Sequence, residues 1–355
     1  MDFDATKRYW AGARFFIIAA SLVIIAGMKA MSNLILIILM ALFITAMSLS
    51  PFLWLKKKKV PEIISIILVI VVIMGLLYTL SLLLAVSVTG FKERLPFYEQ
   101  QFSYLWMSMH EWLIEAEIIT ADTNILNFIK STNLMKSSGG AVSGLGKLIS
   151  DPFLVLFVYI FMMLEVSIFG DKMKLISPKT LGGMHVIIAN IKKYFAIKFL
   201  TSFITGLIIY LGLLAIGVDF ALLWGIIAFV LNFIPSIGSI FAAIPAVLLA
   251  FIQLDPFSGI MTIVLYLVVN MVIGSIIEPP LMGRNLGLSP LIVFLSLLIW
   301  GFILGPVGML LSAPLTMIIK IIFDNRQQTS AVGIIIGDKS SIKELEKKKP
   351  PIGYS

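Results

Sequence analysis

The sequence has no cysteine, only two histidines and few charged residues, which make up 13% of the chain. Without cysteine, the chain can form neither a disulfide nor a thiolate site. A soluble domain needs charge over most of its surface, whereas 59% of these residues are hydrophobic. The composition therefore excludes a soluble fold and predicts an all-α, polytopic membrane protein.

The residues needed for catalysis or cofactor binding are also missing. Two histidines, no cysteine and no paired carboxylates within an apolar run leave no catalytic constellation, so we expect no enzyme activity. A metal site needs several convergent donors, and none is expected. The segment SSGGAVSGLGK at 137–147 lacks the leading glycine of a phosphate-binding loop, and Leu148 replaces its Ser or Thr. We therefore expect no nucleotide, metal or other cofactor.

The formal net charge is +8, yet the cations do not suggest nucleic-acid binding. They form short clusters beside apolar runs, at residues 7–14, 56–59 and 172–198. Two runs separate each cluster from the next, so all three fall on one side, and the positive-inside rule makes that side cytoplasmic. The sequence predicts cytoplasmic N- and C-termini and a lipid bilayer, not nucleic acid, as the surroundings.

Long charge-free runs set the predicted organisation, because a spanning helix needs about 20 apolar residues. Residues 1–91 would hold three N-terminal spans, 92–150 an external helical segment, 151–326 the membrane core, and 327–355 a cytoplasmic tail. The basic stretch 171–198 is typical of a cytoplasmic interfacial helix. The runs lie at 15–28, 30–55, 63–91, 152–170 (with one charge, Glu165), 199–218, 220–254, 256–277 and 285–319.

The external segment begins with a heptad pattern. The spacing alternates between four and three, which predicts a helix that continues the third span into water and packs on a second helix around 124–136. The alternative is an amphipathic helix on the lipid surface. The apolar positions are Phe91, Leu95, Tyr98, Phe102, Leu105, Met109, Trp112 and Ala116.

The core contains an internal repeat, 199–254 and 256–322. A run of 20 uncharged residues precedes one of 35, and a run of 22 precedes another of 35. Thirty-five residues are too many for one straight span, since each residue adds about 1.5 Å across a layer of about 30 Å. Breakers lie in the middle of each long run, IPSIGS at 234–239 and LGPVGM at 304–309. We therefore predict two re-entrant hairpins.

Charge parity gives these two units opposite orientations, as in the inverted repeats of many secondary transporters. Irregular backbone at membrane depth is tolerated only where protein buries it or water reaches it. Two hairpin tips that approach from opposite faces would then form a polar site at the bilayer midplane. The alternative is that the prolines and glycines only kink ordinary packed helices.

The same residues carry a family resemblance. The blocks NFIPSIGSIFAAIPAVLLAF (232–251), EPPLMGRNLGLSP (278–290), GPVGMLLSAPL (305–315) and FVYIFMMLE (157–165) resemble the autoinducer-2 exporter family of bacterial permeases. The likeness is densest from about 150 to 325 and weak over 92–150. It implies a bacterial inner-membrane protein that forms a homo-oligomer, with a pentamer as the expected assembly, and moves solutes without ATP. Some members of the family are described as sodium/proton antiporters.

The expected solute is a small, oxygen-rich signal molecule of the autoinducer-2 type. Such a solute needs hydroxyl, amide and backbone groups, and the scarcity of carboxylates in the runs favours it over a cation. Two alternatives remain: a sodium/proton antiporter, or a structural membrane protein whose segment 92–150 binds a partner. The candidate substrate-binding residues are Asn232, Pro235, Ser236, Gly238, Asn270, Gly305, Pro306, Gly308 and Ser312, and the candidate gate residues are Glu278, Arg284 and Asn285.

Overall fold

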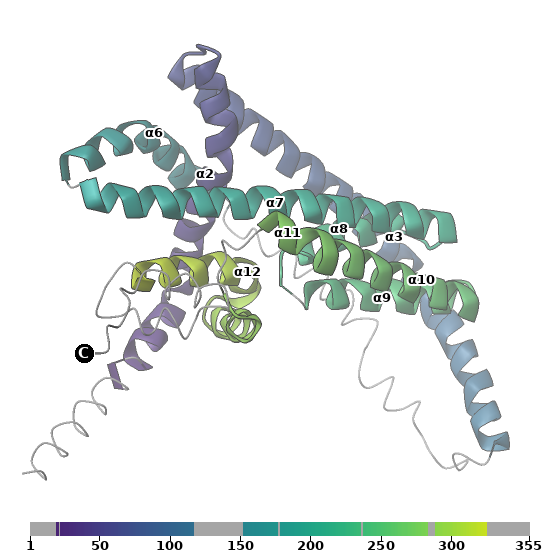
Figure 1. The fold of residues 1–355 in the computed structure, drawn as a ribbon. Coiled ribbons are helices and arrows are strands. Elements are labelled where there is room, and N and C mark those ends of the chain that lie inside the picture. The colour runs from purple at the N-terminus through teal and green to yellow at the C-terminus, as the bar shows by residue number, and fades with distance from the viewer. Residues whose placement is uncertain are drawn as a thin grey trace, which may run out of the picture.

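The structure is a computed structural model that describes residues 19–20, 22–116, 152–176, 178–235, 237–282 and 288–324. The elements formed by these residues are helices (Figure 1), which confirms the predicted all-α, polytopic membrane fold. Five helices of the described ranges are long and apolar enough to cross a membrane. Many of their large apolar side chains are exposed, as lipid contact requires.

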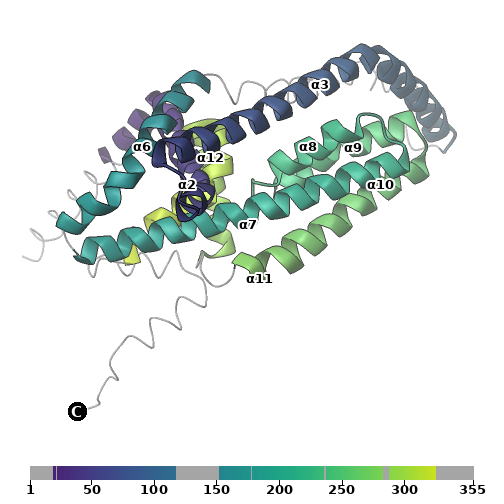
Figure 2. The same ribbon diagram turned by 90° about the horizontal axis from the view of Figure 1, so that it is seen from above.

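The N-terminal part consists of α2 (Ser32–Lys57) and the 54-residue helix α3 (Glu62–Glu115). The predicted continuity of the third span with the external segment is therefore present in α3. The helix changes direction along its length (Figure 2), and Pro96 lies inside it. Proline removes a backbone donor and clashes with the preceding turn, which is the usual cause of such a bend. The second external helix predicted around 124–136 lies outside the described residues.

The heptad pattern of α3 divides into two parts. Phe91 and Tyr98 are buried, and Leu95 and Phe102 pack on the same cluster. Leu105, Met109 and Trp112 are exposed. The first half of the pattern thus contacts the core of the protein itself, while the partner predicted for the pattern lies outside the described residues.

Two long helices follow, α6 (Pro152–Ile176) and α7 (Pro178–Ile216). The sequence predicted a separate interfacial helix at 171–198 and a span at 199–218. The structure differs, because one 39-residue helix, α7, includes most of both segments. Its last part is apolar and helical without a break, so the lysine cluster 192–198 does not end the helix. Lys198 consequently lies on a helix face, where it packs against other spans.

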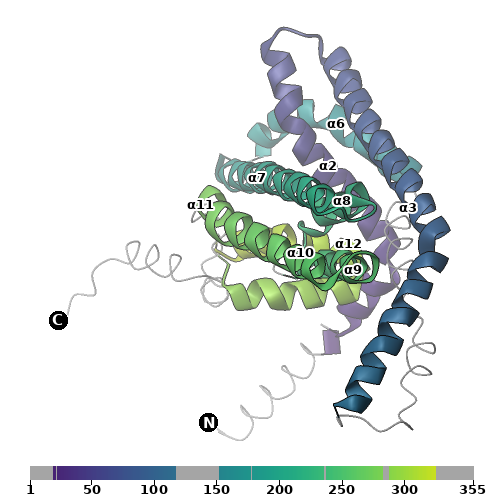
Figure 3. The same ribbon diagram turned by 90° about the vertical axis from the view of Figure 1, so that its right-hand side faces the viewer.

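Hairpin 1 is formed by α8 (Ala221–Leu231), the non-helical residues 232–235 and 237, and α9 (Gly238–Gln253). The break falls at the predicted breakers, and α8 and α9 lie side by side (Figure 3). Gly206 and Gly225 bring α8 close to α7, because a Cβ on Gly206 would lie 2.7 Å from the Gly225 carbonyl oxygen. Small residues at a helix contact allow such an approach between membrane helices.

The next span changes its helical form partway. It starts as α10 (Pro256–Val269), continues as a π-helix, η2 (Asn270–Ile277), and ends as α11 (Glu278–Met282). Asp255 caps its start by accepting a hydrogen bond from the Ser258 N–H at 2.8 Å. The chain packs this span antiparallel to α7 (Figure 2).

Hairpin 2 is the helix α12 (Pro290–Asp324), interrupted at Gly305 with φ 69° and ψ −156°. The Trp300 indole donates to the Thr316 hydroxyl over 3.1 Å, although 16 residues separate the two. In a straight helix that separation would be about 24 Å, so the chain folds back at Gly305. Figure 1 shows one half of α12 end-on and the other lengthwise. The insertion of either hairpin into a membrane, and the inverted relation between the units, stay predictions.

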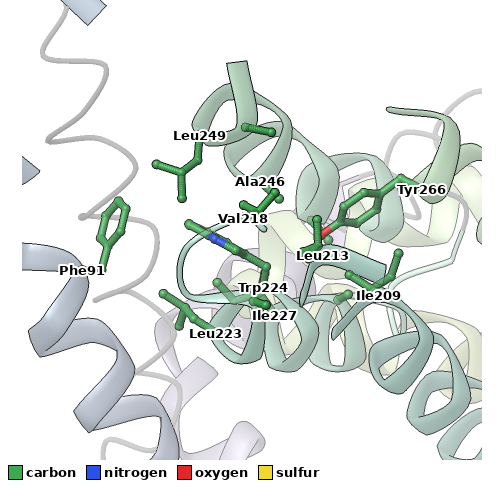
Figure 4. Close-up of a cluster of buried hydrophobic side chains, with 14 of the residues drawn as sticks. Phe91, Ile209, Leu213, Val218, Leu223, Trp224, Ile227, Ala246, Leu249 and Tyr266 are labelled. Carbon is green, nitrogen blue, oxygen red and sulfur yellow. The ribbon is translucent and has the colours of Figure 1, made fainter. Parts of the chain in front are cut away.

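Three apolar clusters form the core. The largest joins α3 with α7, α8, α9 and α10 (Figure 4). A second joins α2, α7 and α12, and a third joins α2, α3 and α6. Because α7 contributes to two of them, it connects hairpin 1 on one side with hairpin 2 on the other.

Candidate functional site

The tip of hairpin 1, residues 232–239, meets a polar face of α7. The Asn232 side-chain amide donates to the Ser202 hydroxyl over 3.0 Å, and both side chains are buried. Asn232 is the C-cap residue that follows α8, and its amide crosses the interface between α8 and α7. A buried amide in an apolar environment is costly unless it is hydrogen-bonded, and Ser202 supplies this partner.

The far side of the tip contacts the irregular span. Ser239, at the start of α9, donates to the Asn270 Oδ1 over 2.9 Å. Asn270 is the first residue of η2, and Gly274 lies one turn later against its side-chain oxygen. π-Helical turns leave backbone groups with altered spacing and occur frequently at functional sites. Tip 1 is therefore bound by side chains to α7 and to η2.

Gly238 and Pro235 shape the turn itself. A Cβ on Gly238 would collide with the carbonyl oxygen of Leu231, so only glycine fits where α9 turns back on α8. Pro235 lies in the turn between the two helices, where its missing N–H interrupts no helical ladder. Ser236 lies outside the described residues.

The polar face of α7 is the part of this site that sequence reasoning missed. Four polar residues of α7 are buried, and they follow one another at intervals of three, one and three residues: Lys198, Thr201, Ser202 and Thr205. The Thr205 hydroxyl has no hydrogen-bond partner among the described residues. Positions i, i+3, i+4 and i+7 share one helix face, so this periodicity could have revealed the face inside the apolar run 199–218.

Glu278 lies at the end of the same face. Its Oε1 accepts from the Lys198 ammonium at 2.7 Å, and its Oε2 lies 3.3 Å from the Thr201 hydroxyl. The two charged side chains are 6% and 14% exposed, so this is a buried ion pair. The sequence offered Arg284, or lysines elsewhere, as the partner of Glu278. Lys198 is the partner found here, and Arg284 and Asn285 lie outside the described residues.

The tip of hairpin 2, residues 305–308, has a different character. Gly305 adopts the left-handed φ that reverses the chain, and Pro306 starts the returning helix. A Cβ on Gly308 would collide with the Trp300 carbonyl oxygen, so the two halves approach closely here. The fully buried Ser312 donates to the Met309 carbonyl oxygen over 2.8 Å, within its own helix.

Phe233 of tip 1 and residues of hairpin 2 belong to the same apolar cluster, which α2 and α7 also build. The residues of hairpin 2 in this cluster include Ile303, Leu304 and Val307. The structure thus brings Asn232, Gly238 and Asn270 together around tip 1, with Ser202 and Ser239. The residues predicted at tip 2 do not join these hydrogen bonds. In the described part of the chain, no group of histidine or acidic residues could hold a metal ion.

Chemically, the arrangement can bind hydroxyl and carbonyl groups. Hydroxyl and amide side chains line α7, tip 1 and the start of η2, and the charged pair lies at one end of the polar face. A buried site of this kind discriminates by hydrogen bonds, because a solute that leaves such groups unpaired pays their desolvation.

Comparison with known proteins identifies a family of membrane transporters. The sequence model of the AI-2E family transporters matches residues 17–328. YhhT of Escherichia coli K12 is 35% identical over 324 residues, which are 90% of this chain and 93% of that protein. AI-2 transport protein TqsA of Escherichia coli K12 is 32% identical over 332 residues, 92% of this chain and 96% of its own. YueF of Bacillus subtilis is 24% identical over 297 residues, 78% and 80% of the two chains. A multi-pass helical chain that matches this family over nearly its whole length belongs to the AI-2E family of transporters.

Proposed function

We propose that this protein exports a small, uncharged, oxygen-rich signal molecule of the autoinducer-2 type by secondary transport. The observation that carries the proposal is the hydrogen-bonded tip of hairpin 1, in which Asn232 meets Ser202 and Ser239 meets Asn270. A polyhydroxylated solute can exchange hydrogen bonds with such groups. The similarity to a relative named as an AI-2 transport protein supports the same substrate class.

The solute site in this proposal includes both hairpin tips. Asn232 and Ser236, with backbone freed around Pro235 and Gly238, bind the solute from tip 1, and Asn270 joins them from η2. Gly305, Pro306 and Gly308 supply backbone groups from tip 2, with Ser312 behind them. The apolar cluster that includes Phe233 and residues of hairpin 2 supports this arrangement, because it places both hairpins against the same face of α7.

The gate in this proposal lies at the cytoplasmic side. Glu278 is the first residue of α11, and Arg284 and Asn285 follow that helix in the chain. The Lys198–Glu278 pair extends this gate onto α7. A buried pair has to open before a hydrated solute can pass along the polar face of α7. The driving force is the solute gradient or a coupled proton.

The assembly and orientation complete the proposal. The protein resides in a bacterial inner membrane with both termini in the cytoplasm and works as a homo-oligomer, with a pentamer as the expected state. The excess of lysine near the cytoplasmic ends of the predicted spans supports the orientation.

A sodium/proton antiporter is the second candidate, and Glu278 is the observation that favours it. Carboxylates within membrane spans frequently mark ion or proton pathways. Glu278 is 14% exposed in a span and already neutralised by Lys198, which leaves it no net negative charge for sodium. The neutral solute therefore fits the site better.

A flux assay separates these candidates. Liposomes that contain the purified protein and are loaded with autoinducer-2 are expected to release it faster than protein-free liposomes. The Asn232→Ala variant is expected to require a higher autoinducer-2 concentration for the same rate. A sodium gradient is expected to drive no proton flux. Sodium-driven proton flux without autoinducer-2 release would instead establish the antiporter.

A further inference from the structure

Asp219 contacts two residues of α3 from a point just before hairpin 1. Its Oδ2 accepts a hydrogen bond from the Tyr98 hydroxyl at 2.7 Å and one from the Arg94 guanidinium at 2.5 Å. Tyr98 is fully buried, whereas Arg94 is mostly exposed. These two residues lie four apart on either side of Pro96, so they share one face of α3 and reach the same carboxylate.

The backbone of Asp219 connects the two ends of hairpin 1. Its N–H donates to the Gln253 Oε1 over 2.9 Å, and its carbonyl oxygen accepts from the Trp224 indole over 3.1 Å. Trp224 belongs to the first turn of α8, and Gln253 is the last residue of α9. Gln253 also donates to the Gly217 carbonyl oxygen at 3.3 Å. One residue thus joins α3, the entry of the hairpin and its exit.

Aromatic packing supports the same junction. The Phe91 ring lies with its centroid 5.9 Å from Tyr98, 5.7 Å from Phe220 and 5.6 Å from Trp224. Figure 4 shows Phe91 reaching the cluster from α3, with Trp224 at its centre. Phe220 adopts a left-handed conformation, with φ 56°, that a residue with a side chain seldom takes without support. The hydrogen bonds of Asp219 therefore lie next to a packed aromatic cluster formed by Phe91, Tyr98, Phe220 and Trp224.

The base of the hairpin determines where the tip lies. Helix α8 has 11 residues and would measure about 16 Å, so Asn232 lies one short, stiff helix away from Asp219. At the tip, Asn232 and Ser239 hold the hairpin by one side-chain hydrogen bond each. A small tilt at the base would displace both of them from Ser202 and Asn270.

We propose that Asp219 is a positioning residue for the solute site: by binding Tyr98 and Arg94 of α3, it fixes the base of hairpin 1 and so keeps the tip against α7 and η2. The inference rests on the proposed function for its effect on transport. Its effect on the tip is independent of which solute is carried. The segment of α3 beyond the third span thereby controls a site that it does not touch.

The test uses the absence of native cysteine. Ile237→Cys places one thiol at the tip and leaves the Ser239–Asn270 hydrogen bond in place. The purified protein is reacted with a small anionic methanethiosulfonate in lipid nanodiscs, where both faces are accessible. Three substitutions are then made one at a time in this cysteine variant: Tyr98→Phe, Asp219→Asn and Arg94→Gln. Tyr98→Phe keeps the ring and removes only the hydroxyl. Tyr104→Phe is the matched control, since Tyr104 lies on the same helix, is 59% exposed, and its hydroxyl accepts from the Gln100 side chain.

The expected result is faster labelling of the tip thiol in Tyr98→Phe and Asp219→Asn, roughly threefold to tenfold, which is the range for loss of a partly exposed charge-assisted hydrogen bond. Arg94→Gln is expected to have a smaller effect because the guanidinium is exposed, and Tyr104→Phe none. In transport, the first two variants are expected to raise KM while the amount of folded protein is unchanged.

Unchanged labelling in both Tyr98→Phe and Asp219→Asn, with normal folding, would overturn the inference. A lower yield of folded protein with an unchanged KM and an unchanged labelling rate would mean that Asp219 only stabilises the fold, which also overturns it. If autoinducer-2 is not carried, KM cannot be measured, yet the labelling rates still decide whether Asp219 positions the tip. The failure of the proposed function is therefore distinguishable from the failure of this inference.

Discussion

Lys198 and Glu278 form a buried ion pair between α7 and the start of α11, with 2.7 Å between Nζ and Oε1. Eighty residues separate them in the chain, and the Thr201 hydroxyl lies within reach of the second carboxylate oxygen. Two opposite charges in this environment are stable only as a pair, because each alone would lose its hydration without compensation.

The first prediction concerns this pair. Lys198→Met is expected to destabilise the protein by about 3–5 kcal/mol, because it leaves Glu278 buried and unpaired. The double variant Lys198→Met/Glu278→Met is expected to recover most of that loss. Thermal unfolding in detergent measures both, and a double variant less stable than the single one would contradict the account. Glu278→Gln is expected to slow transport with little change in KM.

The second prediction concerns the contact between α7 and α8. Gly206→Ala is expected to destabilise the protein by about 1–3 kcal/mol, because the added methyl group meets the Gly225 carbonyl oxygen and the Phe229 side chain. Gly75→Ala is the control, since a Cβ there has nothing within 4 Å. Unfolding temperatures of the two variants should differ clearly. Equal stability would mean that the two helices are not closely packed.

The third prediction concerns the heptad pattern of α3. Phe102→Glu is expected to loosen the protein, because Phe102 packs on the main cluster, and a buried apolar side chain contributes about 1.5–3 kcal/mol. Leu105→Glu changes a side chain that is 46% exposed. If the predicted second external helix, or another copy of the chain, covers Leu105, both variants weaken oligomer stability and expose 92–150 to protease. Unchanged protease resistance in Leu105→Glu would show that the second half of the pattern faces water or lipid.

The fourth prediction concerns topology. A single cysteine at Asn285 is expected to react with an impermeant thiol reagent only from the cytoplasmic side, whereas one at Ser236 should label differently. The wild-type sequence has no cysteine, so the introduced thiol is the only one in each variant. Reaction of the Asn285 variant from outside in intact cells would remove the double-hairpin arrangement, because it depends on the parity of the spans.

The sequence indicated the helical breaks well, for a local physical reason. Pro235, Gly238 and Gly305 cannot continue a regular helix in their settings, so the position of both folds was visible in the residue types. The length of the two 35-residue uncharged runs then predicted that the chain folds back within each of them. The heptad spacing likewise indicated that α3 continues past residue 91.

Other features depended on contacts that the sequence does not display. Lys198 belongs to a cationic cluster that predicts a cytoplasmic segment. Only the packing of α7 against α11 makes it the partner of Glu278. Thr201, Ser202 and Thr205 are ordinary residues of an apolar helix until Asn232 and Glu278 face them. The residue types of 270–277 do not mark the π-helix, which packs against α7 and accepts the Ser239 hydrogen bond at Asn270.

The most direct test of the central claim is the concentration dependence of autoinducer-2 flux in liposomes that contain Asn232→Ala or the wild-type protein at matched amounts. The variant loses the hydrogen bond to Ser202 and one solute contact, and a lost hydrogen bond corresponds to about 0.5–1.5 kcal/mol. The account predicts a KM raised by roughly twofold to tenfold with the maximal rate largely kept. Wild-type KM and wild-type flux in Asn232→Ala would contradict it and place the solute pathway away from the tip of hairpin 1.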